Sequence, residues 1–240
     1  MHKSSSTSLR PVANKLCNMK SVIFDLDGTL VDTSGDLVAA ANACFVSMGE
    51  APQLDPKTDA STAFLGTLAM LELGFSRLGY MPSASKMQDY YEYLSDFYEK
   101  NIDCHTYMYD GVVDCLDTLK TRGYLMGICT NKRIRFAEKL INRMGIRHYF
   151  QAVVGADTLP VRKPDSGHLL GTIKAMNGNP MKAIMIGDTI TDRNAAKNAC
   201  VPCVLVTFGP DGAKVADLKP EGLLDHFDQL PDMMDTMIKG

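Results

Sequence analysis

The sequence predicts an α/β fold in which a doubly wound parallel sheet carries an inserted all-helical segment. Val22, Ile23 and Phe24 form an unbroken apolar run, as in strands that are buried on both faces of a parallel sheet. Beyond Gly111, short apolar runs alternate with amphipathic stretches, which is typical of repeated βαβ units. Between residues 33 and 108 only helical patterns are visible. The helical segment therefore interrupts the α/β domain directly after its first strand.

Helical periodicity dominates the inserted segment. Apolar side chains recur at three- and four-residue steps over residues 37–48, with Ser34 as a candidate N-cap and Gly49 as a stop signal. Residues 50–60 are polar, contain two prolines and are predicted to form a loop. A second amphipathic helix is predicted over residues 87–98, and no strand is expected in the segment.

Strands and helices alternate in the second half of the chain. This alternation predicts βαβ units whose strands run parallel and lie next to one another in a single sheet. The strands are predicted at residues 124–129, 152–155, 183–187 and 204–208, and the helices at 112–119, 134–144, 169–176 and 195–200.

The predicted elements divide the chain into two domains. Residues 20–32 and 109–240 are expected to form the α/β core, and residues 33–108 a helical cap domain. Residues 1–18 are Ser-rich and polar, without the apolar stretch of a secretory signal. Residues 1–19 are accordingly predicted to be a disordered tail or to follow from an upstream start codon.

The composition excludes several classes of protein. The 240 residues are 45% hydrophobic and carry a net charge of -3, so no basic face is expected for a nucleic acid. No apolar run reaches the ~20 residues that span a bilayer, and no membrane partner is expected. Seven scattered cysteines, an odd number, indicate reduced thiols and a cytoplasmic protein. We expect a monomer or a homodimer.

Two aspartates follow the first predicted strand. Side chains alternate along a strand, so Asp25 and Asp27 leave the same face, roughly 6–7 Å apart along the chain. At 4 Å two such charges repel by about 4 kcal/mol at an effective dielectric of 20, and a cation or a shared proton has to offset this. The alternative interpretation is a strand end whose aspartates cap the next turn.

Polar side chains also follow the other predicted strands, where ligands collect in open α/β sheets. A hydroxyl and an amide stand at Thr130 and Asn131, a cation at Lys163, and two more carboxylates at Asp188 and Asp192. Each residue alone also fits a helix cap, a solvated loop cation or a turn former. Together they predict a site for an anion bound with a divalent metal ion.

These residues resemble the four motifs of the haloacid dehalogenase superfamily. The sequences DLDGT at 25–29 and GDTITD at 187–192, the Thr130–Asn131 pair and Lys163 match the motifs in order. Further segments are similar to phosphoglycolate phosphatases with a helical cap after the first motif: residues 109–112, 123–124, 129–132, 162–165 and 206–209. The resemblance implies a Rossmann-like core and hydrolysis of a small phosphorylated metabolite such as 2-phosphoglycolate.

The resemblance also assigns catalytic roles. Asp25 would attack phosphorus and form an aspartyl phosphate, and Asp27 would protonate the leaving alkoxide and later deprotonate water. Thr130 and the Asn131 amide would hold phosphoryl oxygens, while Lys163 would neutralise charge. These groups act by positioning and charge stabilisation.

The resemblance further implies Mg²⁺ as the cofactor. The ion would be held by Asp25, the Asp27 carbonyl and Asp188, and Asp192 would orient that ligand set. Lys132 and Arg133, which follow Asn131, either line the mouth of the site and attract anions or form a solvated helix start.

Three alternatives to a phosphatase fit the sequence less well. A halide leaves without a proton, so Asp27 argues against dehalogenation. A sugar phosphomutase of the same superfamily needs a cap that grips a second phosphate, but residues 58–76 contain no Lys, Arg or His. A non-catalytic phosphate-binding regulatory module is expected to lack a motif aspartate or the lysine, and none is missing.

The turn at Phe64–Thr67 departs from the Gly-Asn-Gly-like turn that phosphoglycolate phosphatases often show there. We hypothesise that Gly66 and Thr67 offer backbone N–H groups to a small carboxylate or polar end of the substrate. Replacing Gly66 with a bulky residue is then expected to raise KM for the true substrate. Steady-state kinetics tests this, and an unchanged KM would reject the hypothesis.

Overall fold

A six-stranded parallel sheet forms the centre of the molecule in the computed structural model, which describes residues 19–238. The strands lie in the order β5–β4–β1–β6–β7–β8, and all neighbours are parallel. They are β1 (Ser21–Phe24), β4 (Leu125–Cys129), β5 (Ala152–Val154), β6 (Ala183–Gly187), β7 (Cys203–Val206) and β8 (Gly222–Leu224). The predicted α/β fold is confirmed. The prediction for the N-terminal tail falls, apart from Met19, outside the described residues.

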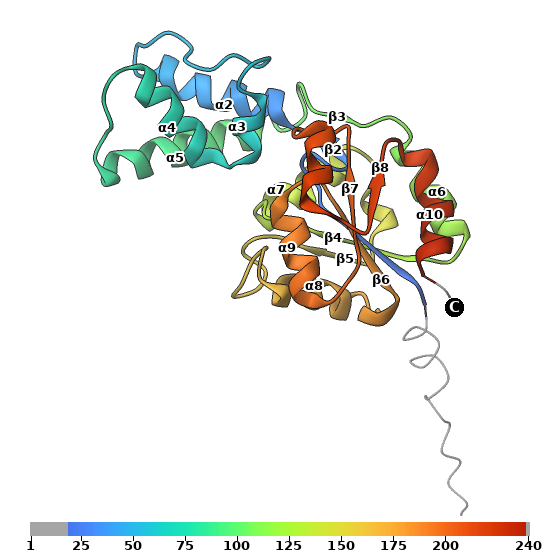
Figure 1. Ribbon diagram of the computed structural model, residues 1–240. Helices are drawn as coiled ribbons and strands as arrows, with labels where there is room; N and C mark the ends of the chain where they lie inside the picture. Colours follow the sequence, from blue (N-terminus) through green and yellow to red (C-terminus); the bar gives the residue numbers. More distant parts are fainter. Residues whose placement is uncertain (1–18, 239–240) are drawn as a thin grey trace, which may run out of the picture.

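Helices cover both faces of this sheet (Figure 1). On one face lie α8 (Ser166–Ala175) and α9 (Ile190–Ala199), and on the other α6 (Val112–Thr121), α7 (Ile134–Arg143) and α10 (Leu230–Met237). Ile23 belongs to the apolar cluster of the α8–α9 face, whereas Val22 and Phe24 belong to that of the opposite face. All three side chains are fully buried. Burial on both faces explains the continuous apolar run in the sequence.

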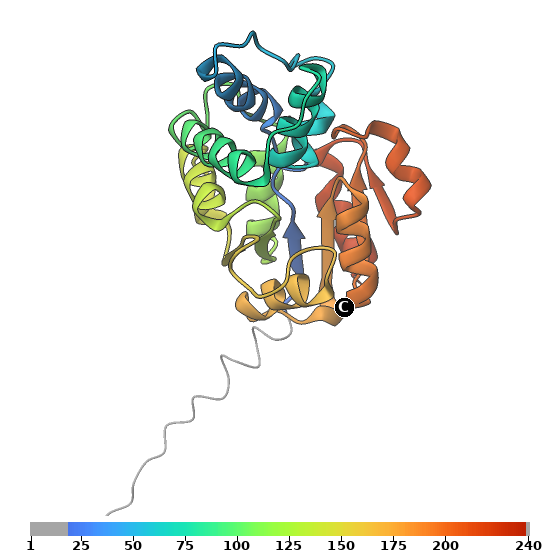
Figure 2. The ribbon, with the colours of Figure 1, turned by 90° about the vertical axis from the view of Figure 1, so that its left-hand side faces the viewer.

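The remaining helices form a group of their own, which we call the helical insertion. It consists of α2 (Ser34–Ser47), α3 (Ala60–Phe64), α4 (Thr67–Arg77) and α5 (Ala84–Lys100). Figure 2 shows that β1 points toward this group, so the insertion lies at the carboxyl end of the sheet. Its interior is aromatic: the ring of Phe75 lies 5.1 Å from Phe45 and 5.2 Å from Tyr90, measured between centroids.

Two short antiparallel strands join the insertion to the core. Val31 of β2 (Val31–Asp32) pairs with Met108 of β3 (Tyr107–Met108). The carboxylate of Asp36 accepts hydrogen bonds from the backbone N–H groups of His105 and Thr106, each at 2.9 Å. Both linkers are therefore tied to each other where the chain leaves and re-enters the core.

The prediction that residues 33–108 contain no strand was wrong, because β3 lies at its end. A two-residue strand is too short to show any periodicity, and its partner lies far away in the sequence. The N-cap of α2 is Thr33, not the predicted Ser34, which is the first residue of the helix. Several further elements were not predicted from the sequence: α3, α4, β8, α10 and the four 3₁₀ helices at Arg147–Tyr149, Pro180–Lys182, Gly212–Leu218 and Phe227–Gln229.

Helix α9 begins five residues before its predicted start. Thr189 and Asp192 form a capping box, in which the Thr189 side chain accepts from the Asp192 N–H and Asp192 accepts from the Thr189 N–H.

Within residues 19–238, no helix is both long and apolar enough to cross a membrane.

Gly74 of α4 gives a test of packing in the insertion. An added Cβ at this position would lie 2.2 Å from Cζ of the fully buried Phe45 ring. We expect Gly74→Ala to lower the free energy of unfolding by about 1–3 kcal/mol from overpacking, against a gain of roughly 1 kcal/mol in helix propensity. Urea unfolding measures the net change. The matched control is Gly171→Ala in α8, whose Cβ would meet only the flexible end of Leu159 at 2.4 Å. Equal effects of the two substitutions would contradict this account.

Candidate active site

The carboxyl ends of the central strands meet at one edge of the sheet, and backbone hydrogen bonds fix the residues that follow them. Asp25 follows β1 and donates its N–H to the Ile186 carbonyl of β6 at 2.8 Å. Thr130 follows β4 and donates its N–H to the Val154 carbonyl of β5 at 3.0 Å. Asp188 follows β6, the other neighbour of β1. The strand order reverses at β1, where open α/β sheets bind ligands.

Three carboxylates form a buried cluster at this edge. One oxygen from each of Asp25, Asp188 and Asp192 lies within 4.8 Å of the others. Oδ1 of Asp188 accepts a hydrogen bond from the Thr29 hydroxyl at 2.9 Å. Its Oδ2 is buried and has no hydrogen-bond partner among the described residues. An orphaned carboxylate oxygen beside two others is the donor arrangement that a metal ion requires.

Gly28 leaves the space beside this oxygen. It adopts a left-handed conformation with φ of +81°, and a Cβ at its position would lie 2.3 Å from Asp188 Oδ2. Only glycine adopts this conformation readily and also leaves room for the carboxylate. The first motif therefore needs a glycine at position 28, because the Asp188 carboxylate of the fourth motif lies so close to its backbone.

Lys163 places its ammonium group among these acids. Its Nζ lies 2.9 Å from Oδ2 of Asp25 and 2.6 Å from Oδ1 of Asp192, and the side chain is 1% exposed. Burial lowers the pKa of Lys163, but attraction to Asp192 and Asp25 outweighs burial and leaves its pKa raised. Lys163 is thus held in its charged form next to Asp25.

Asp192 uses both of its carboxylate oxygens within the protein. Oδ1 pairs with Lys163, while Oδ2 accepts from the N–H of Asp188 at 3.3 Å, the N–H of Thr189 at 3.1 Å and the Thr189 hydroxyl at 2.8 Å. These contacts fix Lys163 and the backbone of Asp188. They favour a role for Asp192 in orienting the site over direct ligation of a metal.

The electrostatics of the cluster call for a cation. Burial raises the pKa of Asp25 to about 6, with Lys163 opposing the shift and Asp192 adding to it. Burial also raises the pKa of Asp188, together with repulsion from Asp192 and Asp25. With all groups ionised, three carboxylates and one ammonium leave two negative charges. A divalent ion that prefers oxygen ligands matches this charge and donor set.

Asp27 is not part of the cluster and has its own partners. Its Oδ1 accepts from the Thr33 hydroxyl at 2.7 Å, and Nζ of Lys132 lies 2.8 Å from Oδ1 and 3.1 Å from Oδ2. The side chain of Lys132 is only 6% exposed, so the interpretation of Lys132 as part of a solvated helix start is wrong. The sequence analysis missed Thr33 as a partner of Asp27. The only signal was a hydroxyl six residues after Asp27.

Thr130 and Asn131 follow β4, and Asn131 joins this loop to the segment that carries Lys163. The Thr130 hydroxyl oxygen accepts from the N–H of Lys132 at 3.1 Å and keeps its own proton available to donate. The Asn131 side chain donates to the carbonyl of Lys163 at 3.0 Å. The structure thus places Asn131 next to Lys163.

Gly66 and Thr67 lie in the helical insertion, at the start of α4. The N–H of Gly66 already donates to the Ala63 carbonyl at 3.2 Å, so Gly66 does not offer the free donor that was predicted. Within residues 19–238, no hydrogen bond or ion pair connects Gly66 or Thr67 to the acidic cluster. The role of these two residues in substrate binding stays a prediction.

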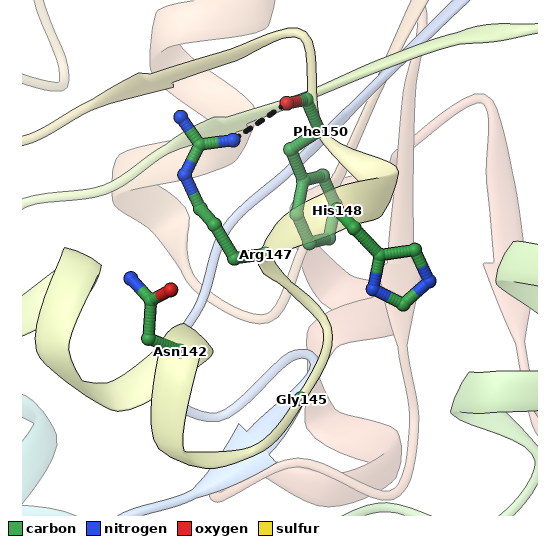
Figure 3. A pocket seen from close by; sticks show the side chains of 5 residues that line it. All are labelled: Asn142, Gly145, Arg147, His148 and Phe150. Atoms are coloured by element: carbon green, nitrogen blue, oxygen red, sulfur yellow. Dashed lines mark hydrogen bonds between the residues drawn. The ribbon is translucent and has the colours of Figure 1, made fainter.

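A separate surface pocket of about 390 Å³ lies elsewhere on the core (Figure 3). It is lined by Asn142, Gly145, Arg147, His148 and Phe150. The pocket follows α7 and precedes β5, so it lies at the amino ends of the strands, opposite the acidic cluster. Arg147 pairs with Glu138 at 2.8 Å and donates to the Phe150 carbonyl at 2.7 Å. Its charge is therefore already compensated, and the pocket is not the candidate site.

Comparison with known families agrees with this geometry. The model of the haloacid dehalogenase-like hydrolase family matches residues 22–206, which contain all the motif residues described above. The chain belongs to this family. The predicted superfamily is thereby confirmed, and the protein is a hydrolase.

Two phosphoglycolate phosphatases are similar in sequence to this protein over most of its length. A phosphoglycolate phosphatase from Agrobacterium fabrum is 36% identical over 90% of this chain and 93% of its own length. A phosphoglycolate phosphatase from Caulobacter vibrioides is 34% identical over 92% of this chain and 93% of its own length.

Solved structures share the fold at lower sequence identity. A predicted phosphoglycolate phosphatase from Haemophilus somnus has a TM-score of 0.81 at 23% identity, over 90% of this chain and 97% of its own. A protein from Thermotoga maritima assigned as a β-phosphoglucomutase has a TM-score of 0.70 at 20% identity, over 91% and 99%. These likenesses concern the fold alone, which a phosphatase and a mutase share.

Charge repulsion in the cluster can be tested with Asp188→Asn. In the folded protein the pKa of Asp25 is raised from its ordinary value of 3.8 to about 6. The free energy of unfolding is therefore expected to fall as pH rises from about 3.8 to about 6, because Asp25 ionises less readily in the folded than in the unfolded chain. Without metal at neutral pH, we expect Asp188→Asn to raise the free energy of unfolding by about 1–3 kcal/mol, because one buried charge is removed.

The same variant tests metal binding. Mg²⁺ is expected to raise the unfolding temperature of the wild type at neutral pH, to raise it less below about pH 5, where protons compete, and to leave Asp188→Asn unchanged. Calorimetry in EDTA and in Mg²⁺ measures each shift. The exposed Asp96→Asn is the control for charge alone. A wild type without a Mg²⁺-dependent shift would contradict the assignment.

Proposed function

We propose that this hydrolase is a Mg²⁺-dependent phosphatase that cleaves a small phosphate monoester such as 2-phosphoglycolate through an aspartyl-phosphate intermediate. The observation that carries the proposal is the buried cluster of Asp25, Asp188 and Asp192 around Lys163. Its two uncompensated negative charges suit a divalent cation, and the names of the relatives support a phosphate monoester as substrate.

The first step transfers the phosphoryl group to Asp25. Its carboxylate oxygen attacks phosphorus, the bond between phosphorus and the ester oxygen breaks, and protonated Asp27 gives its proton to the departing alkoxide. Lys163 neutralises charge on Asp25, from which it lies 2.9 Å away, and on the phosphoryl group. Thr130 donates its hydroxyl, and Asn131 its amide, to phosphoryl oxygens.

The second step returns Asp25 to its starting state. Asp27, now a carboxylate, takes a proton from water, and the water oxygen attacks phosphorus while the bond to Asp25 breaks and orthophosphate leaves. The Mg²⁺ ion would be held by the carboxylates of Asp25 and Asp188 and by the backbone carbonyl of Asp27. It would supply further charge neutralisation when bound. Asp192 orients Lys163 and Asp188.

Residues 33–108, which contain the helical insertion, are proposed to form a cap domain. This domain would close over small substrates at the carboxyl edge of the sheet. Its paired linkers, β2 and β3, are the natural place for the hinge. Of the two cations that flank residues 58–76, Lys57 and Arg77, Arg77 is bound to Asp59 at 2.7 Å and to the Gln53 carbonyl. Arg77 is therefore not free to grip a second phosphate, which supports a phosphatase over a phosphomutase.

We also propose a cytoplasmic location. All six cysteines among the described residues are free thiols, as expected in a reducing compartment.

Turnover of a panel of esters tests the function. We expect hydrolysis of 2-phosphoglycolate to depend on metal. Its kcat/KM is expected to be higher than the kcat/KM for sugar phosphates, nucleoside monophosphates or pyrophosphate. Asp25→Asn is expected to reduce kcat by more than about 10³-fold, because the nucleophile is lost. Borohydride reduction of the acid-quenched enzyme, followed by mass spectrometry, is expected to find homoserine at position 25. Turnover no faster than in Asp25→Asn would favour a binding module, and an isomerised sugar phosphate a mutase.

A further inference from the structure

Lys132 is enclosed between the core and the helical insertion. Its Nζ contacts both carboxylate oxygens of Asp27, at 2.8 and 3.1 Å, and lies 4.7 Å from the centroid of the Tyr98 ring in α5. Lysines are almost never buried unless they are paired. Burial lowers the pKa of Lys132, but Asp27 outweighs that effect and leaves the pKa raised, so the ammonium keeps its charge.

This contact is part of a continuous seam between α5 and α7. The ring of Phe136 packs edge-on against Tyr98 with centroids 5.5 Å apart. Arg135 pairs with Glu99 at 3.3 Å, and Lys139 donates to the Glu99 carbonyl at 2.5 Å. The position of α5 is thereby fixed on the same stretch of chain that supplies Lys132.

We propose that Lys132 is a positioning residue that orients the Asp27 carboxylate for proton transfer and links this orientation to the seating of the helical insertion through Tyr98. The inference rests on the proposed phosphatase function. Oδ1 of Asp27 accepts from both Thr33 and Lys132, whereas Oδ2 accepts only from Lys132. Oδ2 therefore keeps a free lone pair, which carries the proton that is donated to the ester oxygen and later accepts one from water. Proton transfer requires this oxygen within about 2.6–3.2 Å of its target.

The link to the insertion runs through the face of the Tyr98 ring. A cation above an aromatic ring is attracted to the ring face, and more strongly where water is excluded. The Tyr98 hydroxyl is buried without a hydrogen-bond partner among the described residues, but it is close enough to Lys132 to add to the raised pKa of the lysine. The proposal assigns the link to the ring, and Tyr98→Phe separates the ring from the hydroxyl.

Substrates with different leaving groups separate this role from others. An alkoxide leaves only when it is protonated, whereas p-nitrophenolate leaves without a proton, and kcat/KM reports the steps up to phosphoryl transfer to Asp25. We expect Lys132→Met to lower kcat/KM about 10- to 100-fold for both 2-phosphoglycolate and ethyl phosphate, but less than about 3-fold for p-nitrophenyl phosphate. Lys132→Arg is expected to restore part of the loss. Lys174→Met, which removes an exposed lysine, is the matched control.

Several results would overturn the inference. A loss confined to 2-phosphoglycolate would make Lys132 a ligand of the substrate carboxylate. An equal loss on all three esters would indicate a merely structural role, and no loss would exclude any role. A wild type that hydrolyses none of the three esters with Mg²⁺ would instead overturn the proposed function.

The link to the insertion has a readout that does not depend on turnover. We expect Lys132→Met to speed amide hydrogen exchange several-fold in the last turns of α5, relative to the wild type and Lys174→Met. Tyr98→Leu is expected to reproduce the leaving-group-dependent loss of Lys132→Met, while Tyr98→Phe, which keeps the ring, retains most of the activity. Unchanged exchange in α5, or equal losses in the two Tyr98 variants, would overturn the link.

Discussion

The ion pairs of Lys163 are the interaction on which the rest of the site depends. The proposed nucleophile, Asp25, has to be ionised to attack, yet burial raises its pKa to about 6, and Asp192 adds to the shift. Lys163 opposes that shift from 2.9 Å and is itself held by Asp192 at 2.6 Å. Removing one partner of a buried pair typically costs about 3–5 kcal/mol, because the other charge is left uncompensated. In the proposed phosphatase, the cluster is therefore the source of reactivity, and a bound metal ion would relieve its charge repulsion.

The sheet holds part of this concentration of charge in place, because hydrogen bonds to neighbouring strands fix the residues that follow β1 and β4. Asp25 is fixed by a hydrogen bond from its N–H to β6, and Thr130 by one from its N–H to β5. Asp188 is fixed through its N–H by the side chain of Asp192. The carboxylates thus repel one another without being free to move apart. The shape of the site is set by the parallel core, and its chemistry follows from that shape.

The sequence contained the core and its acids but not the contacts between distant segments. Long apolar runs and strand-end residues such as Asp25 and Asp188 are local signals, so they were predicted correctly in position. The pairing of β2 with β3 depends on two residues at each end of the insertion and leaves no periodic pattern. The burial of Lys132 depends on Tyr98, 34 positions away, and no local pattern shows that a lysine beside a helix start is covered. The engaged N–H of Gly66 likewise follows from a turn geometry that its neighbours do not specify.

The two aspartates of the first motif are therefore held by different parts of the molecule. The partners of Asp25 are Lys163, Leu26 and Ile186, all in the core. Those of Asp27 are Thr33, at the start of the insertion, and Lys132, which lies against Tyr98 of α5. A displacement of the insertion would then disturb proton transfer at Asp27 while leaving the nucleophile in place. Since an unprotonated alkoxide is a poor leaving group, the proposed mechanism would then restrict cleavage of alkyl esters to the state in which the insertion is seated.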